Sequence, residues 1–320
     1  MSQDAKKLLA VNLLYALIPV LLLTLPHLLK GVEMEAYGAT YSVAMVALEF
    51  GVIALPTILY FLTPWGRGVA RFFWAQRPTS AIVLVIPLAI CAYFLVTGLT
   101  SLWLAILGML GLSVAPQTVP LPATPGQLGV SVLVIGLAPA LCEEFFFRGT
   151  MQPVLTRHLR PWAAIVLCGC LFGMIHGQLA ALPGHVLLGM GLCLVAYWTR
   201  SIWYTALWHF LQNSMAMVMG YLSSALLEYA ASLGGAEASA MAAQPLALLD
   251  GSLMLILPFG AGTALFLFLL RLTTKRQNQA ELERVQERPC LLAWAPLAIA
   301  LACAAYLYAT SGMAMLGGGA

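Results

Sequence analysis

Long apolar runs, each close to the thickness of a bilayer, recur along almost the whole chain. A transmembrane helix needs roughly 20 mainly apolar residues, so these runs predict a series of membrane-spanning helices. We predict an all-α fold, a polytopic transmembrane helical bundle of about eight or nine spans with no soluble domain. The candidate spans are 8–29, 41–62, 80–100, 128–150, 162–181, 184–199, 202–222, 252–271 and 291–311.

Three stretches between or beside these spans have a different character. The stretch 80–112 is longer than one span, and we expect a helix followed by an interfacial piece, with a break at Gly98. The stretch 113–126 contains four prolines and no charge, which predicts a loop. The segment 64–78 mixes arginines with aromatic residues, which predicts an amphipathic helix at the membrane interface.

The composition supports the membrane interpretation. Of 320 residues, 62% are hydrophobic and only 8% are charged, and the mean hydropathy is +0.92. A soluble domain carries roughly 25% charged residues, so this chain could not cover its surface in water. The composition excludes a soluble enzyme with one anchor, a nucleic-acid binder and a secreted disulfide scaffold. The seven cysteines lie in or beside apolar stretches without a C-x-x-C pair, and we interpret them as small hydrophobic residues.

Lysine and arginine are distributed unevenly between the two sides of the membrane. If the N-terminus is cytoplasmic and the chain alternates through the predicted spans, all 15 basic residues except Lys30 fall on the cytoplasmic side. The positive-inside rule predicts such an asymmetry. We therefore expect a multi-pass protein with a cytoplasmic N-terminus. The Ala- and Leu-rich spans with short loops favour the plasma membrane of a prokaryote.

Ionisable side chains inside predicted spans are candidates for a functional site, because they are costly in a bilayer unless paired or hydrated. Glu144 and Arg148 are four residues apart, so they share a helix face and can form a pair. Glu143 points about 100° away and lacks that partner. A charge cluster at a helix end would explain the pair but explains Glu143 poorly, since its neighbours along the chain are apolar.

Two further spans carry polar groups. His176 lies beside a doubled small-xxx-small face made by Gly169, Gly173 and Gly177, which would let a neighbouring helix come close. His209 and Asn213 are four residues apart on one helix face. Each has a structural alternative: a buried histidine bonded to a carbonyl, or a polar pair that joins two helices.

The remaining polar groups in or near spans are assigned structural roles. Glu49, in the second span, has no visible partner and is interpreted as a structural carboxyl. His27, His158 and His185 lie at the ends of spans and are interpreted as interfacial. Cys142 borders Glu143, but nothing else in the sequence favours a thiol enzyme.

Together the three polar spans supply groups suited to peptide hydrolysis. Glu143 can deprotonate a water that His176 orients, while His209 and Asn213 donate to an oxyanion. The motifs E-E-x-x-x-R, F-x-x-x-H and H-x-x-x-N stand in this order at 143–148, 172–176 and 209–213. This set resembles the signature of the CPBP (Abi) family of intramembrane proteases, which includes type II CAAX prenyl endopeptidases and bacteriocin self-immunity proteins.

The resemblance covers residues 80–222, between an N-terminal part (1–79, spans and the interfacial helix) and a C-terminal part (223–320, spans and a cytoplasmic basic loop). It implies a helical membrane core with a conical cavity, and peptide hydrolysis by a glutamate-activated water. The implied roles are general base for Glu143, water orientation for His176, and oxyanion stabilisation for His209 and Asn213. Glu144, Arg148 and Phe172 would support these residues, and no cofactor is implied.

Several functions remain open at this point. The first is an intramembrane endopeptidase acting near a membrane-anchored, lipidated or C-terminal sorting tail. A zinc-dependent variant would use Glu143, His176 and His209 as ligands. A non-catalytic scaffold or immunity protein would bind a partner peptide. A transporter is disfavoured, since no inverted repeat is visible. The expected partners are a membrane-anchored peptide or protein substrate and the lipid bilayer, without nucleic acid.

Overall fold

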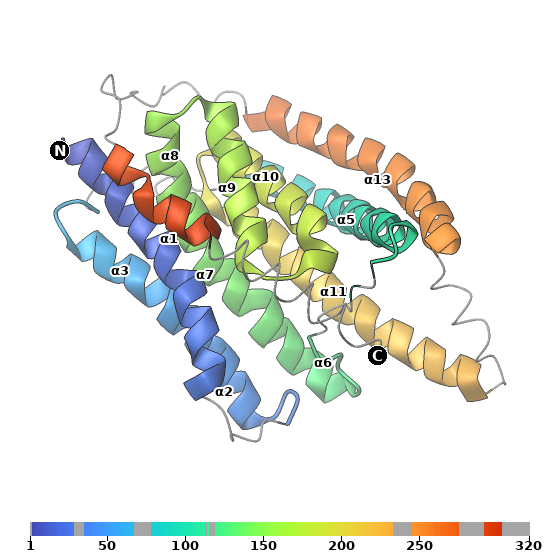
Figure 1. Ribbon diagram of the computed structural model, residues 1–320. Helices are drawn as coiled ribbons and strands as arrows, with labels where there is room; N and C mark the ends of the chain where they lie inside the picture. The colour runs from blue at the N-terminus through green and yellow to red at the C-terminus, as the bar shows by residue number, and fades with distance from the viewer. Residues whose placement is uncertain are drawn as a thin grey trace.

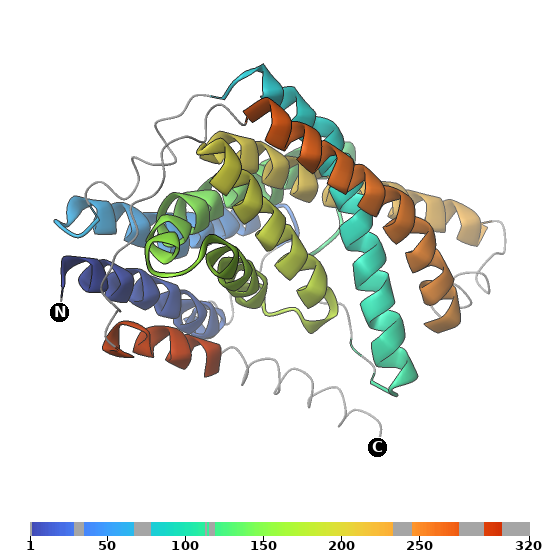
Figure 2. The same ribbon diagram turned by 90° about the horizontal axis from the view of Figure 1, so that it is seen from above.

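The computed structural model is a bundle of helices with no strand among the described residues, which are 2–28, 35–66, 78–112, 114, 119–232, 245–274 and 291–302 (Figures 1 and 2). The predicted all-α fold is confirmed. Five helical segments in this part of the chain are long and apolar enough to cross a membrane. They are Ala39–Leu62, Ser80–Met109, Pro125–His158, Leu179–Thr199 and Leu249–Thr274.

The predicted number of spans is matched only approximately. Helix α1 (Gln3–Leu28) and helix α11 (Ile202–Ser232) coincide with two further predicted spans. Helix α9 (Pro161–Ile175) is apolar but shorter than a full span. The structure describes the ninth predicted span only up to residue 302, and residues 67–77 of the predicted interfacial helix lie outside the described part of the chain.

Two of the long segments are composite helices that contain π-helical turns. The segment Ala39–Leu62 consists of α2 (Ala39–Leu48), the π-turn η1 (Glu49–Ala54) and α3 (Leu55–Leu62). The segment Pro125–His158 consists of five consecutive pieces: α6 (Pro125–Ser131), η3 (Val132–Leu137), α7 (Ala138–Phe146), η4 (Phe147–Met151) and α8 (Gln152–His158). A π-turn inserts an extra residue per turn and re-aims the side chains around it, often at functional sites.

The segment Pro125–His158 begins where the proline-rich stretch 113–126 ends. The Thr124 side chain accepts a hydrogen bond from the Gln127 backbone N–H at 3.2 Å, and Pro125 occupies the first helical turn. Both features are typical of helix N-termini. The segment has 34 residues, more than the predicted 128–150. Glu143 therefore lies close to its middle.

Helix α5 (Val85–Met109) runs unbroken through Gly98, which corrects the predicted break. Helix α13 (Pro245–Thr274) lies along α5 in both views (Figures 1 and 2). A Cβ atom on Gly98 would lie 2.9 Å from Leu255 Cβ and 3.1 Å from the Ser252 carbonyl oxygen. Gly98 thus serves the close packing of two helices and ends neither of them.

Helices α9 and α10 (Leu182–Thr199) pack with almost no side chain between their backbones. A Cβ atom on Gly169 would lie 2.7 Å from the Met190 backbone nitrogen, and one on Gly173 would lie 3.0 Å from that of Val186. The predicted small-residue face is therefore real at these two positions. Gly177 does not belong to it, because α9 ends at Ile175 and Gly177 adopts a φ of 62° in the following turn.

Helix α1 fastens the N-terminal part to the centre of the bundle. The hydroxyl of the buried Tyr15 donates to the Leu171 carbonyl of α9 at 2.9 Å. The Asn12 amide donates to the Ala293 carbonyl at 2.7 Å, which holds the short turn 291–293 against α1. On the other side, the Thr79 backbone N–H donates to the Tyr204 hydroxyl of α11 at 2.9 Å. These contacts join the N-terminal part of the chain to α9 and α11.

Candidate active site

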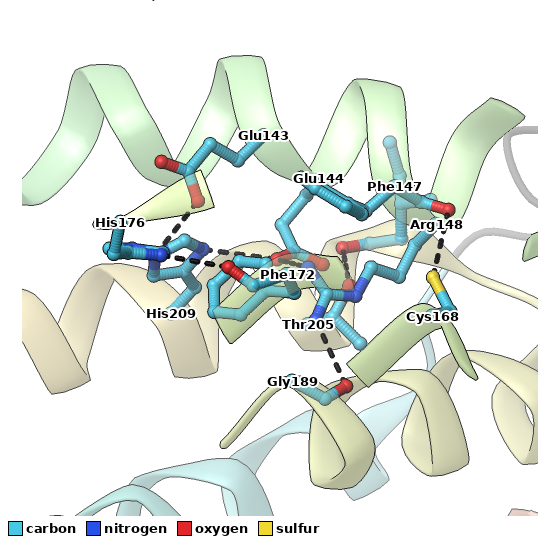
Figure 3. A network of polar contacts seen from close by, with 11 residues as sticks. Glu143, Glu144, Phe147, Arg148, Cys168, Phe172, His176, Gly189, Thr205 and His209 are labelled. Carbon is cyan, nitrogen blue, oxygen red and sulfur yellow. Dashed lines mark hydrogen bonds and ion pairs between the residues drawn. The ribbon is translucent and has the colours of Figure 1, made fainter. Parts of the chain in front are cut away.

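The two adjacent glutamates lie on α7 in the interior of the bundle. Glu143 is 5% exposed and Glu144 is fully buried. Because consecutive helical residues point in different directions, the two carboxylates meet different neighbours. Figure 3 shows Glu144 directed toward Arg148, and Glu143 directed toward the histidines.

Glu144 is neutralised within its own helix. Arg148 Nη1 donates to Glu144 Oε1 at 2.7 Å, and both side chains have no exposed surface. Arg148 Nη2 donates to the Gly189 carbonyl of α10 at 3.0 Å, and the guanidinium lies 4.5 Å from the centroid of the Phe172 ring. The predicted Glu144–Arg148 pair therefore forms, and it connects α7 and η4 with α9 and α10.

His209 of α11 lies between the two carboxylates (Figure 3). Its Nδ1 atom is 3.0 Å from Glu144 Oε1, and its Nε2 atom is 4.0 Å from Glu143 Oε2. An ionised carboxylate only accepts hydrogen bonds, so Nδ1 carries the proton. The distance of 4.0 Å is too long for a direct hydrogen bond. Glu143 Oε2 therefore has no hydrogen-bond partner among the described residues.

His176 stands at the end of α9, with its ring fixed by two contacts. Its Nδ1 atom is 2.8 Å from the Phe172 carbonyl oxygen, which requires Nδ1 to be the donor. In the neutral imidazole, Nε2 is then an acceptor. The Phe172 ring contacts both histidines, with centroid distances of 5.0 Å to His176 and 5.6 Å to His209. Phe172, fully buried, thus holds the two imidazoles around one apolar centre.

Asn213 is engaged with the backbone and not with the carboxylates. Its Nδ2 atom donates to the Ile135 carbonyl at 3.1 Å. Ile135 lies in the π-turn η3. In a π-turn the backbone hydrogen bonds join residues five apart, in place of the four of an α-helix. The predicted pair of oxyanion donors is therefore bonded elsewhere in this structure: His209 to Glu144, and Asn213 to Ile135. Each residue has a further donor for an oxyanion: the second N–H of Asn213 Nδ2, and His209 Nε2 when the imidazole is doubly protonated.

Two residues near the site were interpreted as structural from the sequence. His185 of α10 stacks on His176, with ring centroids 4.1 Å apart, so it belongs to the histidine group and not only to an interface. Glu49 begins η1, which packs against α7, and its charge interacts with those of Glu143 and His209. The signal that could have found Glu49 was present: a carboxyl in the middle of an apolar span. The side chain of His27 lies outside the described residues.

No three His, Cys, Asp or Glu side chains within the described residues gather as a possible metal-binding group. The ligand set that a zinc enzyme would need, Glu143 with His176 and His209, is thus not assembled in this geometry.

A cavity of about 210 Å³ lies elsewhere, between α5, α10 and α13, with an apolar lining that includes Leu95, Leu187 and Trp208. Its lining contains neither glutamate, so it is not the conical active-site cavity that the resemblance implies.

Residues 125–215 match the family model described as type II CAAX prenyl endopeptidase Rce1-like. This segment is Rce1-like. It begins at the first residue of α6, ends in α11 just after Asn213, and contains all three motifs. The Rce1-like core, as residues 125–215 are called below, is shorter than the predicted 80–222. No curated protein and no solved structure matches the chain.

The match confirms the predicted resemblance to CAAX-type intramembrane proteases. Within the Rce1-like core, the structure brings five predicted residues into one connected group: Glu143, Glu144, Arg148, His209 and Phe172. His176 joins this group through Phe172, and Asn213 stands apart from it.

Proposed function

We propose that the protein is an intramembrane endopeptidase in which Glu143 activates a water molecule. The observation that supports this role is the contrast between two neighbouring carboxylates. Glu144 is paired with Arg148 and His209 through Oε1, whereas the nearest ion pair of Glu143 is the 4.0 Å contact with His209 and its buried Oε2 makes no hydrogen bond with any described residue. A buried polar atom without a partner is costly, so its retention favours a place for water or substrate.

The neighbouring groups would complete the reaction. Water bound at Glu143 loses a proton to the carboxylate, and its oxygen attacks the carbonyl carbon of the scissile peptide bond. His176, whose Nε2 is an acceptor, orients that water. His209, through a protonated Nε2, and Asn213, through its second N–H, stabilise the oxyanion that forms on the carbonyl. Arg148 and Glu144 hold α7 and His209 in place, and no metal or other cofactor takes part.

The substrate would be a membrane-anchored peptide or protein, cleaved near a lipidated or C-terminal tail. Because Glu143 lies near the middle of a 34-residue apolar segment, a soluble protein without an anchor could not reach it. The matched family, type II CAAX prenyl endopeptidase Rce1-like, favours a C-terminal tail with an isoprenyl group. We place the protein in a prokaryotic plasma membrane, with its N-terminus in the cytoplasm. In this orientation the substrate tail would enter the site from the cytoplasm or sideways from the bilayer.

The test is cleavage of a quenched fluorescent peptide by the purified full chain in lipid nanodiscs. The peptide ends in a C-a-a-X sequence with a farnesylated cysteine, and a second peptide carries an unmodified cysteine. Glu143→Gln should reduce the cleavage rate by more than the ~10²–10⁴-fold contribution of one acid–base group. The matched control is Glu228→Gln, because Glu228 is exposed on α11 and far along the chain from the motifs. Full activity of Glu143→Gln would refute the mechanism.

The comparison of the two peptides tests the substrate class. Faster cleavage of the farnesylated peptide supports an anchored tail as the substrate. Equal cleavage of both peptides would remove the requirement for a lipid anchor. Binding of either peptide by the wild-type chain without any cleavage would favour a non-catalytic scaffold or immunity protein.

A further inference from the structure

Glu49 is a carboxyl group in an apolar span without a charge to balance it. It lies within the segment Ala39–Leu62, one of the five long apolar segments. Its Oε2 atom is buried and makes no hydrogen bond, and no ion pair joins it to any described basic residue. An unpaired ionisable group inside a membrane costs several kcal/mol, so its presence calls for a function.

Glu49 lies on an element that packs against the candidate active site. It is the first residue of the π-turn η1, and η1 packs against α7, the helix that carries Glu143 and Glu144. The charge of Glu49 acts on Glu143 and His209, and it also acts on Cys142, the residue before Glu143. Such π-turns frequently occur where a helix presents a functional side chain.

Peptide hydrolysis needs a second proton transfer, to the leaving amine. Most groups near Glu143 already have fixed partners. Glu144 is bonded to Arg148 and His209, and His209 uses its Nδ1 proton in that contact. His176 donates its Nδ1 proton to the Phe172 carbonyl. Glu49, whose charge interacts with that of Glu143, has a buried oxygen without a hydrogen bond and, unlike Glu144, no ion pair with a described basic residue.

We propose that Glu49 is the proton donor to the leaving amine, acting as the partner of Glu143; this assignment rests on the proposed endopeptidase function. Before reaction, Glu143 is ionised and Glu49 is protonated, so the two carboxyls hold one proton and one negative charge. Two such carboxyls close together disfavour double ionisation. The general-acid and general-base roles are thereby divided between two helices.

The two carboxyls exchange roles during one turnover. Glu143 removes a proton from water as the water oxygen bonds to the carbonyl carbon. The Glu49 proton passes to the amide nitrogen, the C–N bond breaks, and the amine leaves. Glu143 is then protonated and Glu49 ionised, and transfer of the proton from Glu143 to Glu49 restores the starting state. The net reaction consumes one peptide bond and one water molecule, and forms one carboxyl and one amino group.

The test compares two substrates that differ only in the leaving group. One is the farnesylated quenched peptide, and the other replaces its scissile amide with a thioester. A thiolate leaves without being protonated, so thioester cleavage does not need the acid. Glu49→Gln should lower peptide cleavage by about 10²-fold or more and leave thioester cleavage near the wild-type rate. Glu143→Gln should abolish cleavage of both substrates, and Glu228→Gln should change neither.

Each outcome decides the assignment. Peptide cleavage by Glu49→Gln at the wild-type rate would overturn it, and so would an equal loss on both substrates. Glu49→Asp retains a transferable proton at a shorter reach, so it should lose less peptide cleavage than Glu49→Gln. If the Gln variant does not fold, the Asp variant should still lose peptide cleavage preferentially over thioester cleavage, and equal losses would refute the role. Wild-type rates of Glu143→Gln on both substrates would instead refute the proposed function itself.

Discussion

The imidazole rings of His176 and His185 stack, with centroids 4.1 Å apart and ring planes inclined by 25°. One ring comes from the end of α9 and the other from the first turn of α10. Together with the hydrogen bond to the Phe172 carbonyl, this stack fixes the plane of the His176 ring. His185 therefore positions a residue that we expect to orient the attacking water.

The first prediction separates stacking from proton transfer at His185. His185→Phe keeps an aromatic face and should retain most of the activity. His185→Ala removes the stack, which is worth about 0.5–1.5 kcal/mol, and should lower kcat by up to about tenfold. KM should stay unchanged, because His185 is expected to act through the ring of His176 and not on the substrate. If the Phe variant is as inactive as the Ala variant, His185 acts through its nitrogens and stacking is not its role.

The second prediction compares a buried ion pair with a surface one. Arg148→Ala leaves the buried Glu144 carboxylate without its main partner, and we expect a loss of about 3–5 kcal/mol in the free energy of unfolding. Arg157→Ala is the matched control, because Arg157 pairs with Asp4 at 3.3 Å and its side chain is 33% exposed. That loss should stay below about 1 kcal/mol. Thermal unfolding in detergent measures both, and similar shifts would contradict the structural role of the Glu144–Arg148 pair.

The third prediction concerns metal. We expect peptide cleavage to proceed without any bound ion, because the chemistry is assigned to carboxyl and imidazole groups alone. Elemental analysis of active protein should find no stoichiometric metal. Prolonged treatment with EDTA or phenanthroline should leave the cleavage rate unchanged. Inactivation by a chelator, followed by recovery with added zinc, would establish the metalloprotease alternative.

The fourth prediction tests the orientation of the long segment Pro125–His158. Ala123 and Arg160 are exposed residues just beyond its two ends. Each is replaced by cysteine in a chain whose seven native cysteines are changed to alanine. A membrane-impermeant maleimide should label position 160 from the cytoplasmic side and position 123 from the opposite side. The reverse pattern would invert the topology, and with it the direction from which tails enter.

Local spacing in the sequence predicted part of the site correctly. The separation of four residues between Glu144 and Arg148 led directly to the observed 2.7 Å pair, because it is a property of one helix. The same rule placed His209 and Asn213 on one face. It could not show that His209 bonds to Glu144, since that contact depends on how α11 packs against α7.

The contacts that Glu49 and His185 make with the site could not be predicted for the same reason. Glu49 is brought to Glu143 by the packing of η1 on α7, and no pattern in a single sequence reports that contact. His185 lies near a span end, as expected, but the short turn after α9 brings it onto His176. Gly98 was misjudged as a break because a glycine that ends a helix and one that admits a neighbouring helix look identical in sequence.

The close packing of α9 on α10 through glycines also predicts which mutations will inactivate the protein. Any glycine codon becomes an alanine codon by one base change, and at Gly169, Gly173 or Gly189 the added methyl group would press on the facing helix. The displaced backbone would carry away the Gly189 carbonyl that Arg148 uses as its anchor. A random-mutagenesis screen for inactive alleles should therefore recover these three codons repeatedly, although none of them encodes a group that could transfer a proton.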